Sequence, residues 1–214
     1  MIINKKHKLN FSNWPISCKI GILIIIISWG SMIISIILAP TSFSPLTNYM
    51  SSLGNSTYNP NGAFIYNSSV TITGVLFFIF FIGLYQWYSD ILLDKIILLT
   101  TQVFGFLLAI TIMLTGIFSE DFKPQHVFWS IIAGILGFLV NVSIALYLFK
   151  QKESIKKISY LIFGLIIFYV IFLFILSPEN VLTEWIVRTL GDINLVLMLY
   201  NFNHIYQVRK SSLS

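Results

Sequence analysis

The sequence predicts an all-α, polytopic membrane protein with six transmembrane helices. Hydrophobic residues make up 57% of the 214 residues and charged residues only 10%, whereas a soluble domain carries about 25% charge. Six apolar segments are long enough to cross the hydrocarbon core, which takes roughly 20 helical residues. The basic residues also gather in alternate connections between these segments, as they do in proteins that cross the membrane several times.

The six spans are expected at residues 16–39, 63–87, 92–118, 127–149, 158–177 and 183–205. Stretches such as GILIIIISWGSMIISIILA lack the alternation of a strand, and backbone groups in lipid must bond within their own segment, so helices are expected. The first segment exceeds the apolar core of a signal peptide, about 7–15 residues, so we expect it to be a retained span. The connections after the first are short, which favours a single domain over residues 1–214.

The orientation follows from Lys and Arg in the short connections. One side would hold eleven of the 13 basic residues, and the other side only Lys123, with Arg188 inside the last span. The eleven are Lys5, Lys6, Lys8, Lys19, Lys95, Lys150, Lys152, Lys156, Lys157, Arg209 and Lys210. We therefore expect both termini in the cytoplasm and a multi-pass protein of the cell membrane. Membrane lipid is an expected partner, and nucleic acid is not.

Tryptophans support the same boundaries. Four fall near the ends of the expected spans, where an aromatic belt would place them: Trp14, Trp87, Trp129 and Trp185. Trp29 lies in the middle of the first span, where packing against other helices is the simplest expectation.

The longest connection, residues 40–62, is here named loop one and is expected on the outer side. Most of it lies in the uncharged stretch SPLTNYMSSLGNSTYNPNGAFIYNSSVTITG, residues 44–74, which continues into the second span. There Asn67, Thr71 and Gly74 share a helix face at i, i+4 and i+7. Two alternatives remain open: these small polar residues hold helices together, or the stretch caps a pocket for a lipid or small-molecule ligand.

Two stretches carry a resemblance to a known family. SSLGN…NPNGAFIYNSSVTITGVLFFIFFIGL resembles the start of helix two in the domain-of-unknown-function 998 family of prokaryotic membrane proteins. LTGIFSEDFKPQHVFWSIIAG resembles that family's element between helices three and four. The resemblance implies six helices and no defined activity. Met50-Ser51-Ser52 stands where the family has Ser-Asp, so no role of that Asp is implied here. A more distant likeness links the chain to DRAM-type membrane proteins, through a helix-four histidine and the acid–tryptophan pair Glu184-Trp185.

The connection SEDFKPQH brings Glu120, Asp121 and His126 together at the outer end. Pro124 fits the first turn of the following helix, and acids just before it suit the positive end of that helix. The functional alternative makes His126 a ligand-binding or proton-exchanging group, because imidazole changes charge near neutral pH.

The last span holds a second group, because Glu184, Arg188 and Asp192 follow one helix face at i, i+4 and i+8. Arg188 can therefore bridge both acids. Asp192 would lie near the middle of the bilayer, where an ionised group costs at least about 2.5 kcal/mol unless it is paired or hydrated. The three side chains are expected to face the bundle interior, either as a structural ion pair or as part of a proton or substrate path.

The leading expectation for function is an outward-facing polar pocket that binds a lipid head group or a small solute. Its walls would be loop one, residues 119–126 and the outer half of the last span. The candidate ligand-binding or proton-exchanging residues are Asn67, Glu120, Asp121, His126, Glu184, Arg188 and Asp192. The alternative is a proton-linked transporter that uses Asp192 and Arg188, for which only Asn194, Asn141 and Gln102 could continue a polar path inward.

An enzyme is not expected, and no cofactor or metal site is expected either. The sequence has three histidines, and they are expected in different places: His7 in the cytoplasmic tail, His126 on the outer side and His204 at the inner end of the last span. They therefore cannot meet around one zinc ion. A membrane hydrolase could be assembled from His126, Asp121 and a serine of loop one, but no G-x-S-x-G motif supports it.

Overall fold

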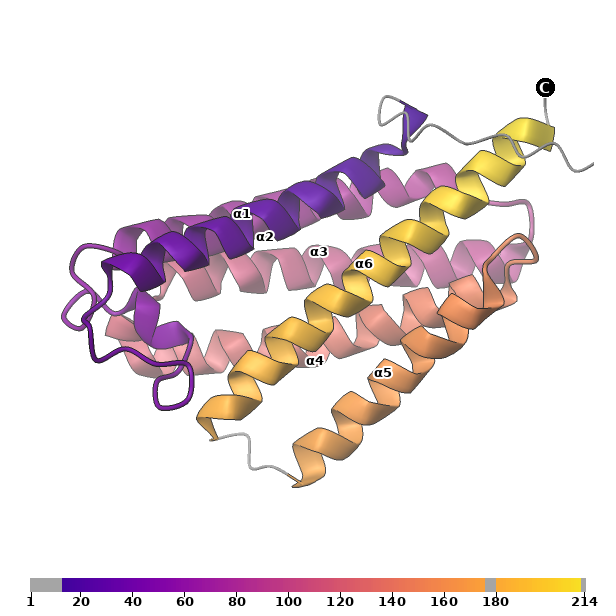
Figure 1. Cartoon of the computed structure of the whole chain (residues 1–214). Helices are drawn as coiled ribbons and strands as arrows, with labels where there is room; N and C mark the ends of the chain where they lie inside the picture. Colours follow the sequence, from indigo (N-terminus) through magenta and orange to yellow (C-terminus); the bar gives the residue numbers. More distant parts are fainter. Residues whose placement is uncertain (1–12, 176–179, 213–214) are drawn as a thin grey trace, which may run out of the picture.

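The structure, a computed structural model, describes residues 13–175 and 180–212. Within them the chain is all-helical, and six long helices run in alternating directions (Figure 1). They are α1 (Ile16–Leu38), α2 (Ala63–Gly83), α3 (Leu92–Ile117), α4 (Lys123–Lys150), α5 (Lys156–Ile175) and α6 (Val181–Ser212). Short 3-10 helices lie in the connections: η2 (Ser51–Gly54), η3 (Leu84–Trp87) and η4 (Glu120–Phe122).

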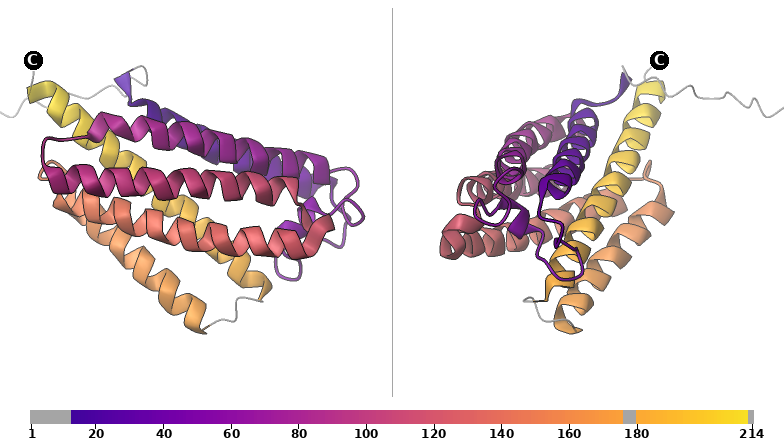
Figure 2. Two further views of the ribbon diagram at one scale, coloured as in Figure 1. Left: turned by 180° about the vertical axis from the view of Figure 1, so that it is seen from behind. Right: turned by 60° about the vertical axis from the view of Figure 1, so that its left-hand side comes forward.

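Helices α1 to α4 pack in chain order, and α6 crosses them to contact α1, α4 and α5. The second view in Figure 2 shows α5 and α6 slanting away from the other four. The beginning of α1 and the end of α6 lie at the same end of the bundle, where the Gln207 amide donates to the Asn13 carbonyl over 3.2 Å. Loop one lies at the opposite end (Figure 1).

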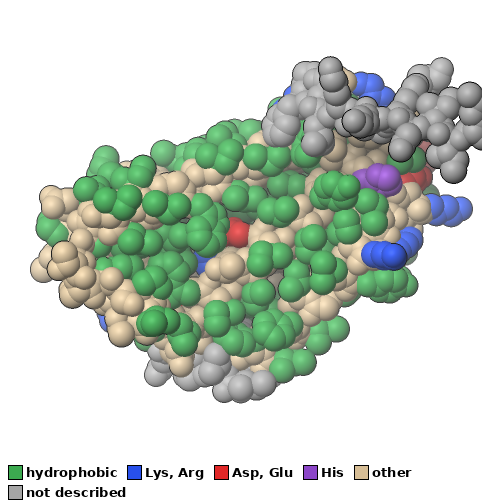
Figure 3. Space-filling model, in the orientation of Figure 1, with side chains coloured by type: hydrophobic (Ala, Val, Ile, Leu, Met, Phe, Trp, Pro, Cys, Tyr) green, Lys and Arg blue, Asp and Glu red, His purple; other side chains and the backbone are tan. Residues whose placement is uncertain are grey.

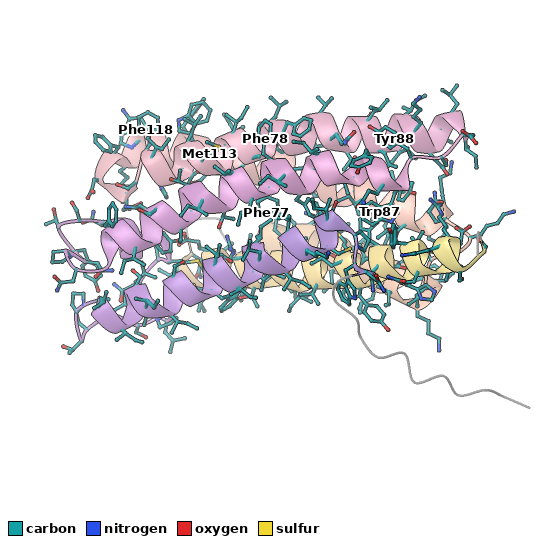
Figure 4. The ribbon with its side chains drawn as sticks, turned by 90° about the horizontal axis from the view of Figure 1, so that it is seen from above. Phe77, Phe78, Trp87, Tyr88, Met113 and Phe118 are labelled. Carbon is teal, nitrogen blue, oxygen red and sulfur yellow. The ribbon has the colours of Figure 1, made fainter. Side chains whose placement is uncertain are left out.

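Close packing of α2 on α3 depends on small residues. A Cβ at Gly116 would lie 2.5 Å from the Thr71 hydroxyl and 2.8 Å from the Asn67 carbonyl oxygen. A Cβ at Gly74 would lie 2.8 Å from the Ala109 carbonyl oxygen. The small, polar face of α2 therefore lies directly against α3, as the helix-packing alternative predicts. In Figure 4, Phe78 and Met113 lie on the side where α2 meets α3, whereas Phe77 lies on the other side of α2.

In the part of the chain that the structure describes, four helical segments are long and apolar enough to cross a membrane: α1, α2 with η3, α3, and η4 with α4. Large hydrophobic side chains remain exposed along the outward faces of the bundle, as a lipid environment requires. Figure 3 shows them over most of one face, with Lys and Arg mainly at the end that carries the termini. These features indicate a membrane protein.

Three helices begin or end beyond their expected spans, and α5 does so by only two residues, at Lys156. Helix α4 begins at Lys123, four residues before the expected position, because Pro124 occupies its first turn as predicted. Helix α6 continues to Ser212, past the apolar stretch, since hydrophobicity marks only the part of a helix that suits lipid. Residues 176 and 177 of the expected fifth span lie outside the described residues.

Trp87 does not belong to an aromatic belt. The turn of η3 places it in the core with no exposed surface, and its indole N–H donates to the Phe202 carbonyl over 3.2 Å. Its ring lies 4.6 Å from the Phe202 ring, and the Tyr147 hydroxyl donates to its carbonyl over 2.8 Å. Trp87 therefore joins α2, α4 and α6 near the end that carries the termini (Figure 4).

Candidate functional site

Loop one is held over the bundle by the first turn of α6. The Glu184 carboxylate accepts the backbone N–H groups of Met50 and Ser51 over 2.8 and 3.1 Å. These donors open η2, so the carboxylate lies where backbone N–H groups lack helical partners. The Trp185 indole N–H donates to the Asn48 carbonyl over 2.9 Å. The acid–tryptophan pair therefore anchors the middle of loop one.

Asparagines hold the remainder of loop one. Asn59 is fully buried, and its amide donates to the Ser35 hydroxyl on α1 and to the Leu53 carbonyl, both over 3.0 Å. Its side-chain oxygen accepts the Gly62 N–H over 3.1 Å. The Asn67 amide donates to the Gly54 carbonyl over 2.8 Å. The uncharged polarity of loop one thus serves hydrogen bonds to its own backbone and to the helices beneath it.

The connection between α3 and α4 closes the same end. Asp121 accepts the Ser56 N–H over 2.8 Å, which ties loop one to η4. Glu120 lies 3.6 Å from the Lys123 ammonium and 3.9 Å from Nε2 of His126. On the other side of its ring, His126 Nδ1 lies 2.9 Å from the Phe118 carbonyl oxygen. Because a carbonyl can only accept, Nδ1 carries the hydrogen in this contact, and Nε2 faces Glu120.

Beneath this cap lies a cavity of about 420 Å³, within the range of about 300–1,000 Å³ that is typical of small-ligand sites. It brings together five of the seven sequence-predicted candidates: Asn67, His126, Glu184, Arg188 and Asp192. Glu120 and Asp121 are not among its lining residues and serve the cap instead. The cavity therefore has walls from α2 to α6 as well as loop one.

The ion pair of α6 lies in the wall of the cavity. At 1.5 Å per residue, Arg188 lies about 10 Å and Asp192 about 16 Å from the start of the helix. Arg188 Nε donates to Asp192 over 2.9 Å, and the Asp192 side chain is only 15% exposed. The expected second bridge, from Arg188 to Glu184, is not among the contacts of the described residues. The reason is that both Glu184 oxygens accept backbone N–H groups of loop one.

Trp29 contributes to this site, although the sequence predicted only packing for it. Its indole N–H donates to the same Asp192 oxygen over 2.9 Å and so joins α1 to α6. A tryptophan in the middle of a span has one hydrogen-bond donor to satisfy, and an acid at the same depth is a suitable acceptor.

Below the ion pair, the Asn194 amide donates to the Asn141 side-chain oxygen over 2.6 Å and links α6 to α4. The side-chain oxygen of Asn194 is buried and has no hydrogen-bond partner in the described part of the chain. Deeper lining residues such as Phe80, Ile144 and Met198 are apolar. Gln102 does not line the cavity; its amide donates to the Phe81 carbonyl and its side-chain oxygen accepts the Tyr88 hydroxyl. The described polar contacts of the cavity therefore end at the asparagine pair.

Across residues 13–175 and 180–212, no group of three or more His, Cys, Asp and Glu side chains is placed to hold a metal ion. His126 and Asp121, which the hydrolase alternative would use, are engaged in other contacts. His126 Nδ1 lies against backbone carbonyls, and Asp121 accepts from Ser56 N–H and the Ser119 hydroxyl. The arrangement is that of a closed cap above a cavity with polar groups at its outer end.

A family model described as "Protein of unknown function (DUF998)" matches residues 22–198. The chain belongs to the DUF998 family. No curated protein and no solved structure matches it, and the more distant likeness to DRAM-type proteins is not shown. The region that matches in this DUF998 protein contains every candidate site residue, from Asn67 to Asp192.

Sequence reasoning missed several residues that form the candidate site or hold its cap, namely Trp29, Ser35, Asn59 and the backbone of Met50 and Ser51. Trp29 carried a signal, because a lone indole N–H within an apolar span needs an acceptor. Asn59 also carried one, as the residue before the proline of a turn. Every residue except proline has a backbone N–H group. The sequence therefore could not predict that Glu184 accepts the N–H groups at the start of η2.

Proposed function

We propose that this DUF998 protein crosses the cell membrane six times, with both termini in the cytoplasm. The basic residues support this orientation, because the helix ends that meet near the termini carry Lys19, Lys95, Lys150, Lys156 and Arg209. Helix α6 packs on α1 and α4, and α5 packs on α4 and α6. With 20 and 32 residues, α5 and α6 are both long enough to cross the hydrocarbon core, which takes roughly 20 helical residues. In this orientation loop one and η4 face outward, and the cavity begins at the outer side of the membrane.

We further propose that the cavity binds a lipid head group or a small solute. The observation that carries this proposal is the capped cavity itself, which collects Asn67, His126, Arg188 and Asp192 beneath loop one. Glu184 supports it by holding the cap rather than by binding the ligand. We propose binding rather than catalysis, because His126 and Asp121 are each engaged with structural partners.

Ligand screening by thermal unfolding in lipid nanodiscs tests this function. A ligand at 100 times its Kd adds about 2.7 kcal/mol. Such a gain raises the Tm by roughly 5–10 °C, at about 2–4 °C per kcal/mol for a chain of this size. The double variant Arg188→Gln with Asp192→Asn should lose the shift. Arg209→Gln with Glu153→Gln removes another Arg–acid pair, 3.7 Å apart and outside the cavity, and should keep it. If no head-group compound or solute shifts the Tm, the proposal is wrong.

The proton-linked transporter is a second candidate. It is favoured by an ion pair and an asparagine pair at successive depths of the same cavity. The apolar lining below Asn194 weighs against it, because a transport path needs polar partners or water to the inner face. Uptake of solutes into proteoliposomes driven by a pH gradient, and lost in Asp192→Asn, would favour transport over binding alone.

A further inference from the structure

The geometry points to an anionic, single-chain amphiphile as the occupant of the cavity. Its hydrocarbon chain lies between α4 and α6, and its carboxylate or phosphate head group contacts Arg188. This inference rests on the proposed binding function and narrows the class of ligand.

Glycines open the space for the chain. Gly134 on α4 and Gly191 on α6 both line the cavity, and a Cβ built on either would meet no neighbouring atom within 4 Å. Gly74 and Gly116, in contrast, leave no room for a Cβ because α2 and α3 touch there. Glycine in a helix costs about 1 kcal/mol relative to alanine. At Gly134 and Gly191 no close packing of helices offsets this cost. The missing side chains instead leave the cavity wider.

The deeper wall of the cavity suits hydrocarbon. It is lined by Phe77, Phe80, Phe138, Leu165, Leu195 and Met198, which come from four helices. An apolar cavity offers water few hydrogen-bond partners and instead accepts apolar ligands. A small polar solute could use only the outer end of this space, whereas an amphiphile matches both its polar end and its apolar depth.

Arg188 keeps unused hydrogen-bond donors at the outer end of the cavity. Arg188 has five N–H donors, and in the described part of the chain only its Nε–H has a hydrogen-bond partner. Each Glu184 oxygen accepts one backbone N–H of loop one, and Oδ2 of Asp192 accepts both Arg188 and Trp29. The free guanidinium nitrogens form a fork that fits the paired oxygens of a carboxylate or phosphate. Asp192 and Trp29 hold the fork in place.

Photo-crosslinking in nanodiscs tests the inference with a mid-chain diazirine fatty acid as the probe. Adducts are expected on the cavity-lining residues of α4 and α6, at a frequency above that on the outer face of α1, which reports bulk lipid. A lysophosphate probe with the same chain tests the other head group. An alkylammonium probe of equal length should give at least tenfold fewer cavity adducts, and preference for it would overturn the inference.

Matched glycine variants separate filling of the cavity from a general effect on helices. Gly134→Leu and Gly191→Leu should each lower cavity adducts at least tenfold. Gly30→Leu and Gly164→Leu serve as controls, because a Cβ at either also meets no neighbouring atom and neither residue lines the cavity. The controls should retain the adducts. Equal loss in all four variants, or in none, would contradict the inference.

Competition distinguishes failure of the inference from failure of the proposed function. Acetate and glycerol phosphate carry the head-group chemistry without a chain, so they should not displace the photoreactive fatty acid at millimolar concentration. If these compounds raise the Tm of the protein while cavity crosslinking is absent, binding of a head group stands and the amphiphile is wrong. If neither occurs, both proposals fall.

Discussion

Trp29 on α1 donates its indole N–H to Asp192 on α6 over 2.9 Å, and the same carboxylate oxygen accepts from Arg188. One carboxylate thus joins two helices that are 163 residues apart in sequence at this point. The charge of Asp192 is compensated by Arg188, and its remaining hydrogen-bonding need is partly met by a neutral donor. Such pairing allows charged groups within an apolar bundle.

Replacing only one residue of the Arg188–Asp192 pair should destabilise the protein more than replacing both. Arg188→Leu leaves an uncompensated carboxylate, which costs up to about 3–5 kcal/mol when the pair is buried. Adding Asp192→Leu should restore much of the loss. Thermal unfolding in detergent measures both variants. A double variant as unstable as the sum of the two single variants would show that Arg188 and Asp192 are not coupled.

Loop one should open when its anchor is weakened. Glu184→Gln replaces two charge-assisted hydrogen bonds to backbone N–H groups, each worth about 1.5–3 kcal/mol, by weaker ones. Hydrogen exchange of residues 48–54 should become at least tenfold faster, while exchange in α3 stays unchanged. Glu153→Gln, at the other end of the bundle, is the control. Unchanged exchange in loop one would mean that Glu184 does not hold the cap.

Substitution by alanine should lower the stability of the protein at Gly116 and raise it at Gly134. Gly116→Ala forces a methyl group against Thr71 and the Asn67 carbonyl, and such overpacking costs about 1–3 kcal/mol. Gly134→Ala meets open space and should gain up to about 1 kcal/mol from helix propensity. The Tm of each variant checks this contrast, and similar shifts for both would contradict the packing described for α2, α3 and α4.

The sequence predicted the six helices well, because a helix that crosses a membrane needs a long apolar segment and such segments are easily recognised. It also singled out several residues that line the cavity, since Asn67, His126 and the α6 residues are polar exceptions in apolar segments. It could not predict that Glu184 binds backbone N–H groups instead of Arg188, because helical spacing reveals only partners on the same helix. It also mistook Trp87 for an interfacial residue, because the inward turn of η3 depends on packing with Phe202.

Cysteine labelling tests the orientation. In a Cys18→Ala background, cysteines placed at Ser56 and Lys123 should react with an impermeant maleimide on intact cells, and one placed at Lys152 should not. The physical reason is the bias of basic residues toward the cytoplasmic side. Permeabilised cells provide the control, in which all three should react. The reverse pattern would place loop one in the cytoplasm.

An experimental density map of the protein in lipid nanodiscs tests the central claim most directly. We expect loop one closed over the outer end and elongated density between α4 and α6. The polar end of that density should lie within hydrogen-bond distance, about 2.7–3.2 Å, of the Arg188 guanidinium. A map in which side chains of α6 pack directly on Gly134 and Gly137, with no space between the two helices, would contradict a ligand-binding cavity.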